Sequence, residues 1–245
     1  CCSRIDAKAV RRDGETNPPT PVPNRPNATG RKKFIAREPM SIRFGVLLIP
    51  SPSFTARVYR ARQLICGQYG SWAAEMHMLH LTVAGFFQCS EAALAEVEAG
   101  LQIAAEESRQ REPRFSLHQQ GVTGASGNIF LDLSGPQRPE ALHKLHGDVV
   151  DIVRRVSGAV LEMEHVEGGY WPHVTMMQYA KLPSAVMADA LEFAQGVVDD
   201  LAVPESTNAW RLLLVRFQSQ AAEEDWSEGR WAPDLSWDII SSYPL

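Results

Sequence analysis

Residues 78–85 read Met-Leu-His-Leu-Thr-Val-Ala-Gly, and residues 171–177 read Trp-Pro-His-Val-Thr-Met-Met. In each stretch a histidine and a threonine flank one apolar residue, giving the pairs His80 with Thr82 and His173 with Thr175. Short apolar and β-branched runs bounded by glycine or proline predict strands. Because side chains alternate between the two faces of a strand, the histidine and threonine of each pair share a face. Two such strands side by side would line one cleft with two imidazoles and two hydroxyls.

These four side chains suit the cleavage of a phosphodiester. That reaction removes a proton from the attacking oxygen and gives one to the leaving oxygen. Histidine serves both steps near neutral pH, because its unperturbed pKa is about 6.5. The threonine hydroxyls can donate hydrogen bonds to the non-bridging phosphate oxygens, where charge accumulates in the transition state. A single His-x-Thr is a weak signal, whereas two copies in strand-like surroundings are specific.

The paired motifs resemble those of the 2H phosphoesterase superfamily, which contains 2′-5′ RNA ligase-like proteins and cyclic phosphodiesterases. The resemblance covers the chain from about Met40 to its last residue. It implies an α+β fold that is bilobal, with two antiparallel sheets, outer helices, a pseudo-two-fold axis and a central cleft. It also implies that His80 and His173 form the catalytic pair and that Thr82 and Thr175 bind the phosphate.

Three further side chains are candidates for binding the substrate. Tyr170 and Trp171 come directly before the second motif, where a base could stack on either ring. A tryptophan at the start of a strand can instead pack on the core, and this alternative stays open for Trp171. Arg216, in a late apolar strand, resembles a basic residue that family members carry there, and a surface arginine is its alternative.

The other histidines do not form a metal site by sequence. His77 and His80 are three residues apart, and on a regular strand that spacing sends the two rings to opposite faces. No cysteine or carboxylate cluster accompanies them, so we expect no metal and no cofactor. His165 lies among glutamates that would raise its pKa without implying catalysis.

Composition divides the chain into residues 1–39 and residues 40–245. The first segment is Pro-rich and carries nine Lys/Arg against four Asp/Glu, while the remainder carries 15 against 25. We expect residues 1–39 to be a disordered basic tail, or sequence upstream of the true start, because they contain too few large apolar groups to form a core. A role in organelle targeting is a further interpretation. Otherwise the cysteine pattern and the lack of a long apolar run predict a cytoplasmic protein with no membrane span.

Periodicity and capping residues predict the order of elements in residues 40–245. Ser90 and Ser184 are expected to cap helices, because serine before an apolar periodic run is a helix start signal. The predicted helices span 54–68, 90–107, 139–156 and 184–201. The predicted strands span 42–49, 78–85, 115–122, 128–133, 171–177, 210–218 and 236–240. Strands and helices that alternate in this way, with one motif strand in each half, favour an α+β fold.

The function that these observations indicate is a metal-independent phosphoesterase acting on a cyclic phosphate or on a 2′-5′ linked nucleotide or RNA end. The acidic balance of residues 40–245 argues against a long nucleic-acid track, so the partner is expected to be a small nucleotide or an RNA end, and the protein a monomer. Three alternatives remain. One is a nucleotide- or RNA-binding protein without turnover, another an ADP-ribose cyclic phosphate hydrolase, and the third a structural domain with core histidines.

Overall fold

The structure is a computed structural model that describes residues 40–135, 139–162, 169–222, 226 and 229–245. The described elements belong to one compact unit, Glu38–Leu245. The predicted tail of residues 1–39 and the histidine at position 165 lie outside the described residues. No described helix is long and apolar enough to cross a lipid bilayer.

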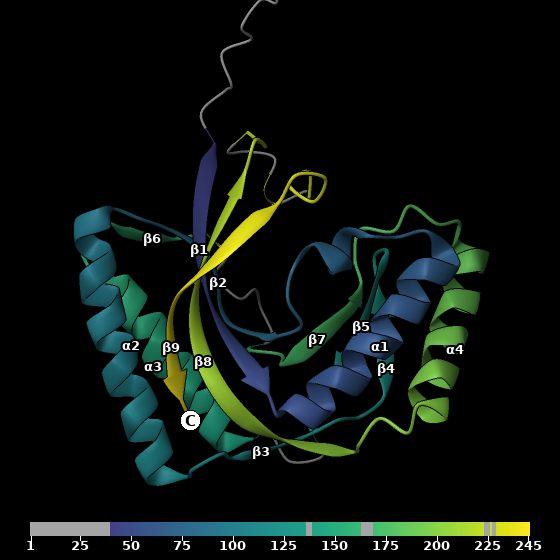
Figure 1. Cartoon of the computed structure of the whole chain (residues 1–245), viewed down its shortest axis with the longest axis horizontal. Coiled ribbons are helices and arrows are strands. Elements are labelled where there is room, and N and C mark those ends of the chain that lie inside the picture. Colours follow the sequence, from purple (N-terminus) through teal and green to yellow (C-terminus); the bar gives the residue numbers. More distant parts are fainter. Residues whose placement is uncertain (1–39, 136–138, 163–168, 223–225, 227–228) are drawn as a thin grey trace, which may run out of the picture. The chain divides into compact units, whose positions relative to one another are not determined.

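The chain alternates helices and strands as expected from its sequence (Figure 1). The helices are α1 (Pro52–Tyr69), α2 (Glu91–Arg111), α3 (Glu140–Arg155) and α4 (Ser184–Asp200), with a short 3₁₀ helix, η1 (Ala73–Met76). The strands are β1 (Ser41–Pro50), β2 (Leu81–Cys89), β3 (Ser116–His118), β4 (Val122–Ala125), β5 (Asn128–Asp132), β6 (Ala159–Leu161), β7 (His173–Met177), β8 (Ser206–Ser219) and β9 (Ser236–Pro244). The α+β class predicted from the sequence is confirmed.

Among the described residues the strands form one hydrogen-bonded order, β3-β8-β1-β2-β7-β5-β4, with β6 beside β2 and β9 beside β8. All of these strand pairs are antiparallel. The two sheets expected from the resemblance are therefore joined, and few residue pairs join them. β1 and β8 pair over the whole of β1, whereas β2 and β7 share a single register pair, Leu81 with Val174. The two halves of the fold meet at the two motif strands.

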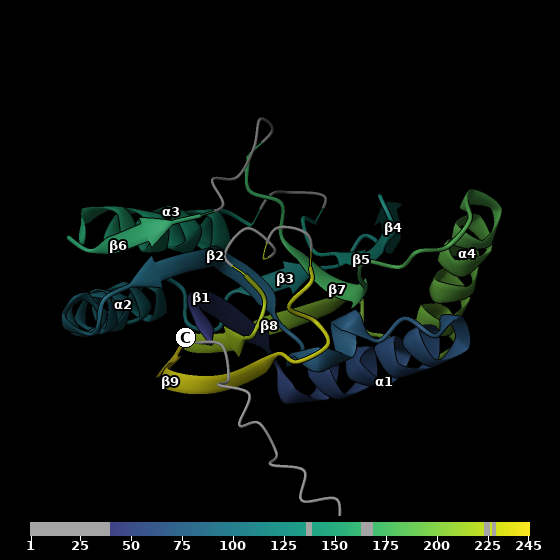
Figure 2. The same cartoon turned by 90° about the horizontal axis from the view of Figure 1, so that it is seen from above.

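Helices cover the two halves on opposite sides, as both cartoon views show (Figures 1 and 2). α2 and α3 lie together beside β1, β2, β8 and β9, and α1 and α4 lie together beside β7, β5 and β4. α1 follows β1 in the chain but covers the other half. Its Cys66 thiol donates to the Met176 carbonyl of β7 over 3.3 Å. One helix thus ties the halves together from outside the sheet.

Alternation along the central strands separates two apolar clusters. On β1, Phe44, Val46 and Leu48 face the main core, while Leu47 belongs to a second cluster with Phe217 on the other face. The second cluster also contains Trp226, Trp231, Ala232 and Leu235 from the β8–β9 connection. A central strand with apolar side chains on both faces is buried on both sides. One face packs on helices, and the other forms part of a cavity wall.

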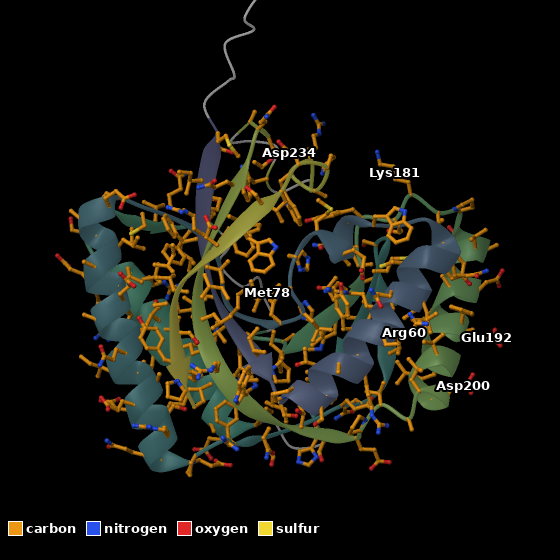
Figure 3. All side chains as sticks on the ribbon, viewed as in Figure 1. Arg60, Met78, Lys181, Glu192, Asp200 and Asp234 are labelled. Carbon is orange, nitrogen blue, oxygen red and sulfur yellow. The ribbon has the colours of Figure 1, made fainter. Side chains whose placement is uncertain are left out.

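The β8–β9 connection is fixed to the sheet by polar and steric contacts. Asp234, labelled in Figure 3, accepts hydrogen bonds from the Ser219 hydroxyl at 2.6 Å and from the Gln220 amide at 2.8 Å. Gly229 has φ +72° and lies close to the Tyr179 ring, where an added Cβ would come within 2.2 Å of a ring carbon. Only glycine fits both constraints. The connection therefore packs from the β8 half onto the segment that follows β7.

Two local expectations differ from the structure. The strand expected over 115–122 is broken into β3 and β4, because Gly121 adopts φ +92° and its amide donates to the Gln119 side chain at 2.9 Å. A residue with positive φ does not continue a regular strand. Ser90 caps α2 as expected, through a bond from the Ala93 amide at 3.2 Å. Ser184 does not cap α4, because that helix begins after Pro183 without a side-chain cap.

The two serines give a matched test of the capping assignment. Ser90→Ala is expected to lower the free energy of unfolding by about 1 kcal/mol, because the first turn of α2 loses its side-chain acceptor. Ser184→Ala is the control and is expected to change stability by less than about 0.5 kcal/mol. Urea unfolding of the full chain measures both. Equal destabilisation by the two substitutions would contradict the assignment.

Candidate active site

The register between β2 and β7 brings the two motifs together. Leu81 pairs with Val174 in an antiparallel arrangement, and both side chains are fully buried. Continued by one residue in each direction, this register places His80 opposite Thr175 and Thr82 opposite His173. Since alternate residues share a face, all four side chains point away from the side on which Leu81 and Val174 are buried. Neighbouring side chains on antiparallel strands lie about 5 Å apart at Cβ.

These four side chains line one cavity of about 470 Å³. Its walls come from both halves of the fold, including Leu47 of β1, Phe130 of β5 and Phe217 of β8. The volume is within the usual range for small-molecule sites, roughly 300–1,000 Å³. The sequence predicted the pairing of the motifs but not the depth of the cavity, which depends on the β8–β9 connection.

The two imidazoles are held in the same way. Nδ1 of His80 lies 2.8 Å from the Met78 carbonyl, and Nδ1 of His173 lies 3.0 Å from the Trp171 carbonyl. A carbonyl only accepts hydrogen bonds, so each Nδ1 carries the proton. Each ring thus donates to the backbone two residues before it, and Nε2 is left as the nitrogen that can serve a ligand. In a neutral ring that Nε2 has a free lone pair.

The surroundings shift both histidines toward the neutral form. Burial, with a smaller contribution from the neighbouring His77, lowers the pKa of His80 to about 3. Burial also lowers the pKa of His173, while the charge of Asp132 acts in the opposite direction. Asp132 is the register partner of His173 on β5. Of the two imidazoles, His173 alone has a carboxylate that favours its protonated form.

His77 also lines the cavity, and the sequence argument about it is wrong. Its ring is buried and meets the His80 ring edge to face, with 5.1 Å between the ring centroids. The argument assumed a regular strand from position 77, but β2 begins at Leu81 and His77 directly follows η1. Nδ1 of His77 lies 3.1 Å from the same Met78 carbonyl that binds His80. The two rings therefore share one backbone acceptor.

A buried arginine holds this turn in place. The Arg62 side chain of α1 is 1% exposed, and its Nη2 donates to the His77 carbonyl at 3.0 Å. Its Nε donates to Glu75 Oε1 at 3.1 Å. Met78, whose carbonyl binds both rings, is labelled in Figure 3 between β1 and α1. An ion pair between α1 and η1 thus fixes the backbone that orients His80.

Tyr170 does not line the cavity, so the expected stacking role is corrected. The residue is 9% exposed and packs face to face on His146 of α3, with ring centroids 4.0 Å apart. Its hydroxyl donates to the Thr82 carbonyl at 2.9 Å, and Nδ1 of His146 lies 2.6 Å from the Val83 carbonyl. Both groups hold the backbone of β2 from the core side. The apolar surroundings that bury the ring also remove it from any ligand.

The other two predicted binding residues have different positions. Trp171 is 37% exposed, and its ring packs against His173 with centroids 4.6 Å apart. It therefore lies at the site without lining the cavity. Arg216 lies on the opposite face of β8 from Phe217 and forms an ion pair with Asp238 of β9 at 2.9 Å. The phosphate-binding role expected for Arg216 is corrected, because alternation along the strand directs it away from the cavity.

Among the described residues, no three His, Cys, Asp or Glu side chains converge as a metal site would require. The thiol of Cys66 is also unsuited to nucleophilic catalysis. Burial raises its pKa to about 12, so the sulfur stays protonated. The imidazoles at the cavity are the groups whose unperturbed pKa lies near neutral pH.

The sequence of the chain matches a known protein family. Residues 50–219, more than half of the chain, match the sequence profile of the 2′-5′ RNA ligase superfamily. The chain belongs to this superfamily of 2H phosphoesterases. The matched residues include both motifs and the strands that carry them.

Solved structures to which the chain is similar include LigT, Usb1 and a structure described as a phosphoesterase. Escherichia coli LigT complexed with 3′-AMP is 18% identical, with a TM-score of 0.46 over 83% of this chain and 97% of LigT. Kluyveromyces marxianus Usb1 is 13% identical, with a TM-score of 0.37 over 83% of this chain and 98% of Usb1. A structure described as a phosphoesterase is 14% identical, with a TM-score of 0.47 over 84% of this chain and 99% of its own. No curated protein sequence matches the chain.

The buried ion pair of this 2H phosphoesterase can be tested directly. Arg62→Met is expected to lower the free energy of unfolding by about 3–5 kcal/mol, because Glu75 and the His77 carbonyl lose a buried partner. Arg60→Met on the exposed side of the same helix is the control and is expected to change stability by less than about 0.5 kcal/mol. Urea unfolding measures both variants. An Arg62 variant as stable as the control would show that the pair does not hold the turn.

Proposed function

We propose that this protein is a metal-independent phosphoesterase that acts on a cyclic phosphate or a 2′-5′ linked nucleotide or RNA end. The observation that carries the proposal is the convergence of His80, Thr82, His173 and Thr175 on one cavity. Two imidazoles with Nε2 available satisfy the need for a base and an acid on either side of one phosphorus.

We assign the base to His80 and the acid to His173. The pKa of His80 is lowered to about 3, so its Nε2 is unprotonated at neutral pH and can take the proton of the attacking water or hydroxyl. Asp132 favours the protonated form of His173, which gives its Nε2 proton to the leaving oxygen. One P–O bond forms as the other breaks, and the proton taken by one imidazole balances the proton given by the other. The reaction changes no oxidation state.

The threonines stabilise the transition state in this scheme. Each hydroxyl lies opposite the histidine of the other motif and can donate to a non-bridging phosphate oxygen. Negative charge increases on these oxygens as the attacking group adds, so donors fixed beforehand favour the transition state. No lysine or arginine is among the described residues that line the cavity. A substrate with one phosphate group fits such a site better than a polyphosphate.

Substitution of the four residues tests the proposal. With 2′,3′-cyclic nucleotides or 2′-5′ dinucleotides as substrates and EDTA present, His80→Ala and His173→Ala are each expected to lower kcat by about 10²- to 10⁴-fold. Thr82→Val and Thr175→Val remove one donor each and are expected to lower kcat by about 10²-fold. His118→Ala, at an exposed position on β3, is the control.

Two results would contradict the proposal. Histidine variants that fold normally and retain the wild-type rate would leave only a binding role. Turnover that is lost in EDTA and restored by zinc or manganese would overturn the metal-independent mechanism.

The pH dependence of kcat/KM follows from the two pKa shifts. The reactive free enzyme has His80 neutral and His173 protonated, so activity falls below the pKa of His80 and above the pKa of His173. Because burial lowers both values, the maximum is expected below pH 6.5. Asp132→Asn removes the charge that raises the pKa of His173, so the alkaline limb is expected to move to lower pH. A maximum above pH 7, or an alkaline limb unchanged by Asp132→Asn, would contradict the assignment.

A further inference from the structure

The cavity extends beyond the four motif side chains into an aromatic compartment. This compartment is lined by Phe86, Tyr179, Phe217, Trp231 and Leu235. Trp231 meets Phe86 edge to face at 6.1 Å and Tyr179 edge to face at 5.9 Å. Rings of this kind bind a flat aromatic group through stacking and edge contacts. The two ends of one cavity thus differ, one being suited to a phosphate and the other to a ring.

The two ends are connected by β2. Thr82, Ala84, Gly85 and Phe86 of this strand all line the cavity, and register shifts in its pairing with β1 make its alternation irregular here. At about 3.3 Å per residue, the backbone advances by at most about 13 Å from Thr82 to Phe86. That span accommodates a sugar between a phosphate at Thr82 and a base near Phe86. A nucleotide would therefore lie along β2.

A carboxylate borders the aromatic end. The Glu162 amide donates to the Phe86 carbonyl at 3.0 Å, which fixes Glu162 beside that ring, and Glu162 lines the cavity. Its side chain is 22% exposed. Nε of the buried Arg43 lies 2.5 Å from Glu162 Oε1, and the Gln88 amide donates to the same oxygen at 2.8 Å. Both contacts are made to Oε1, and among the described residues no hydrogen bond to Oε2 is present.

The carboxylate of Glu162 limits which groups can bind at the aromatic end of the cavity. An ionised carboxylate only accepts hydrogen bonds, so it recognises an N–H or O–H donor and repels a carbonyl oxygen. The paired Arg43 guanidinium balances this charge, but Arg43 is buried and is not among the described residues that line the cavity. Cytosine presents an amino group where uracil presents a carbonyl oxygen. Adenine also presents an amino group on the corresponding edge.

We propose that Glu162 is a specificity-determining residue that accepts a hydrogen bond from the exocyclic amino group of a nucleobase held in the aromatic compartment. The site would then prefer amino-bearing bases, with uracil the least favoured. This inference rests on the proposed function, because it takes the motif end as the phosphate site. It adds the identity of the base to the reaction class.

Cytidine and uridine form the matched ligand pair for the test, because they differ at the amino position. Calorimetric titration of the full chain with cytidine 3′-monophosphate and uridine 3′-monophosphate is expected to show at least about tenfold tighter binding of the cytidine nucleotide, since hydrogen bonds to charged groups are strong. Adenosine 3′-monophosphate is likewise expected to bind more tightly than the purine riboside analogue without the amino group. Equal affinities, a uridine preference or no binding of any of the four would overturn the inference.

The variant Glu162→Gln tests the residue itself. It retains the side-chain shape but replaces one carboxylate oxygen by an amide NH2, which donates hydrogen bonds instead of accepting them. The cytidine preference is therefore expected to fall to within about twofold. Glu192→Gln, on the exposed surface of α4, is the control and should leave the preference unchanged. If Glu162→Gln does not fold, Phe86→Leu is used instead. Phe86→Leu is expected to weaken the binding of both nucleotides about equally. If this substitution alone removes the cytidine preference, the Phe86 ring recognises the base, and the role of Glu162 is overturned.

Turnover is measured separately so that the two proposals can fail independently. Cleavage of cytidine and uridine 2′,3′-cyclic phosphates at equal kcat/KM would retain the phosphoesterase and overturn base recognition. No turnover of either substrate, together with tight binding of the cytidine nucleotide, would retain base recognition as a property of the cavity and overturn the proposed reaction.

Discussion

One backbone pairing, Leu81 opposite Val174, determines the geometry of the site. Both side chains are fully buried, so the register cannot slip by a residue without turning apolar groups outward and polar groups into the core. The same pairing sets which histidine lies opposite which threonine. The convergence of the four motif side chains on the cavity depends on these two strands meeting at this point. The surrounding fold serves to hold the pair where it is.

The support comes mainly from bonds to the backbone of the motif strands. On the core side, Tyr170 and His146 bind consecutive carbonyls of β2. On the cavity side, the Met78 carbonyl accepts from two imidazoles, and Arg62 holds the preceding turn. Contacts of this kind fix the main chain and leave the reactive edges of the side chains free. Preorganisation of this sort is what a two-imidazole reaction requires, because neither ring has to reorient during proton transfer.

Alternation was enough to predict the motif pairs, their shared face and the α+β class, because the period of a strand is a local property. The environments of residues whose partners are distant in the sequence were harder to predict. His77 lies next to His80 because the strand begins one residue after His80, and no propensity fixes a strand start that closely. Arg216 faces Asp238 because β9 pairs with β8, which cannot be known from the composition of β8 alone. Tyr170 and Glu162 acquire their environments from α3 and β1.

The small number of paired residues between the two halves of the sheet has a mechanical consequence. β1 and β8 resist sliding with a long ladder of backbone bonds, whereas β2 and β7 offer one paired position. The sheet is therefore least resistant to bending at this position, although α1 and the β8–β9 connection also link the halves. Because each motif strand carries one of the two imidazoles, bending here would change the distance between them.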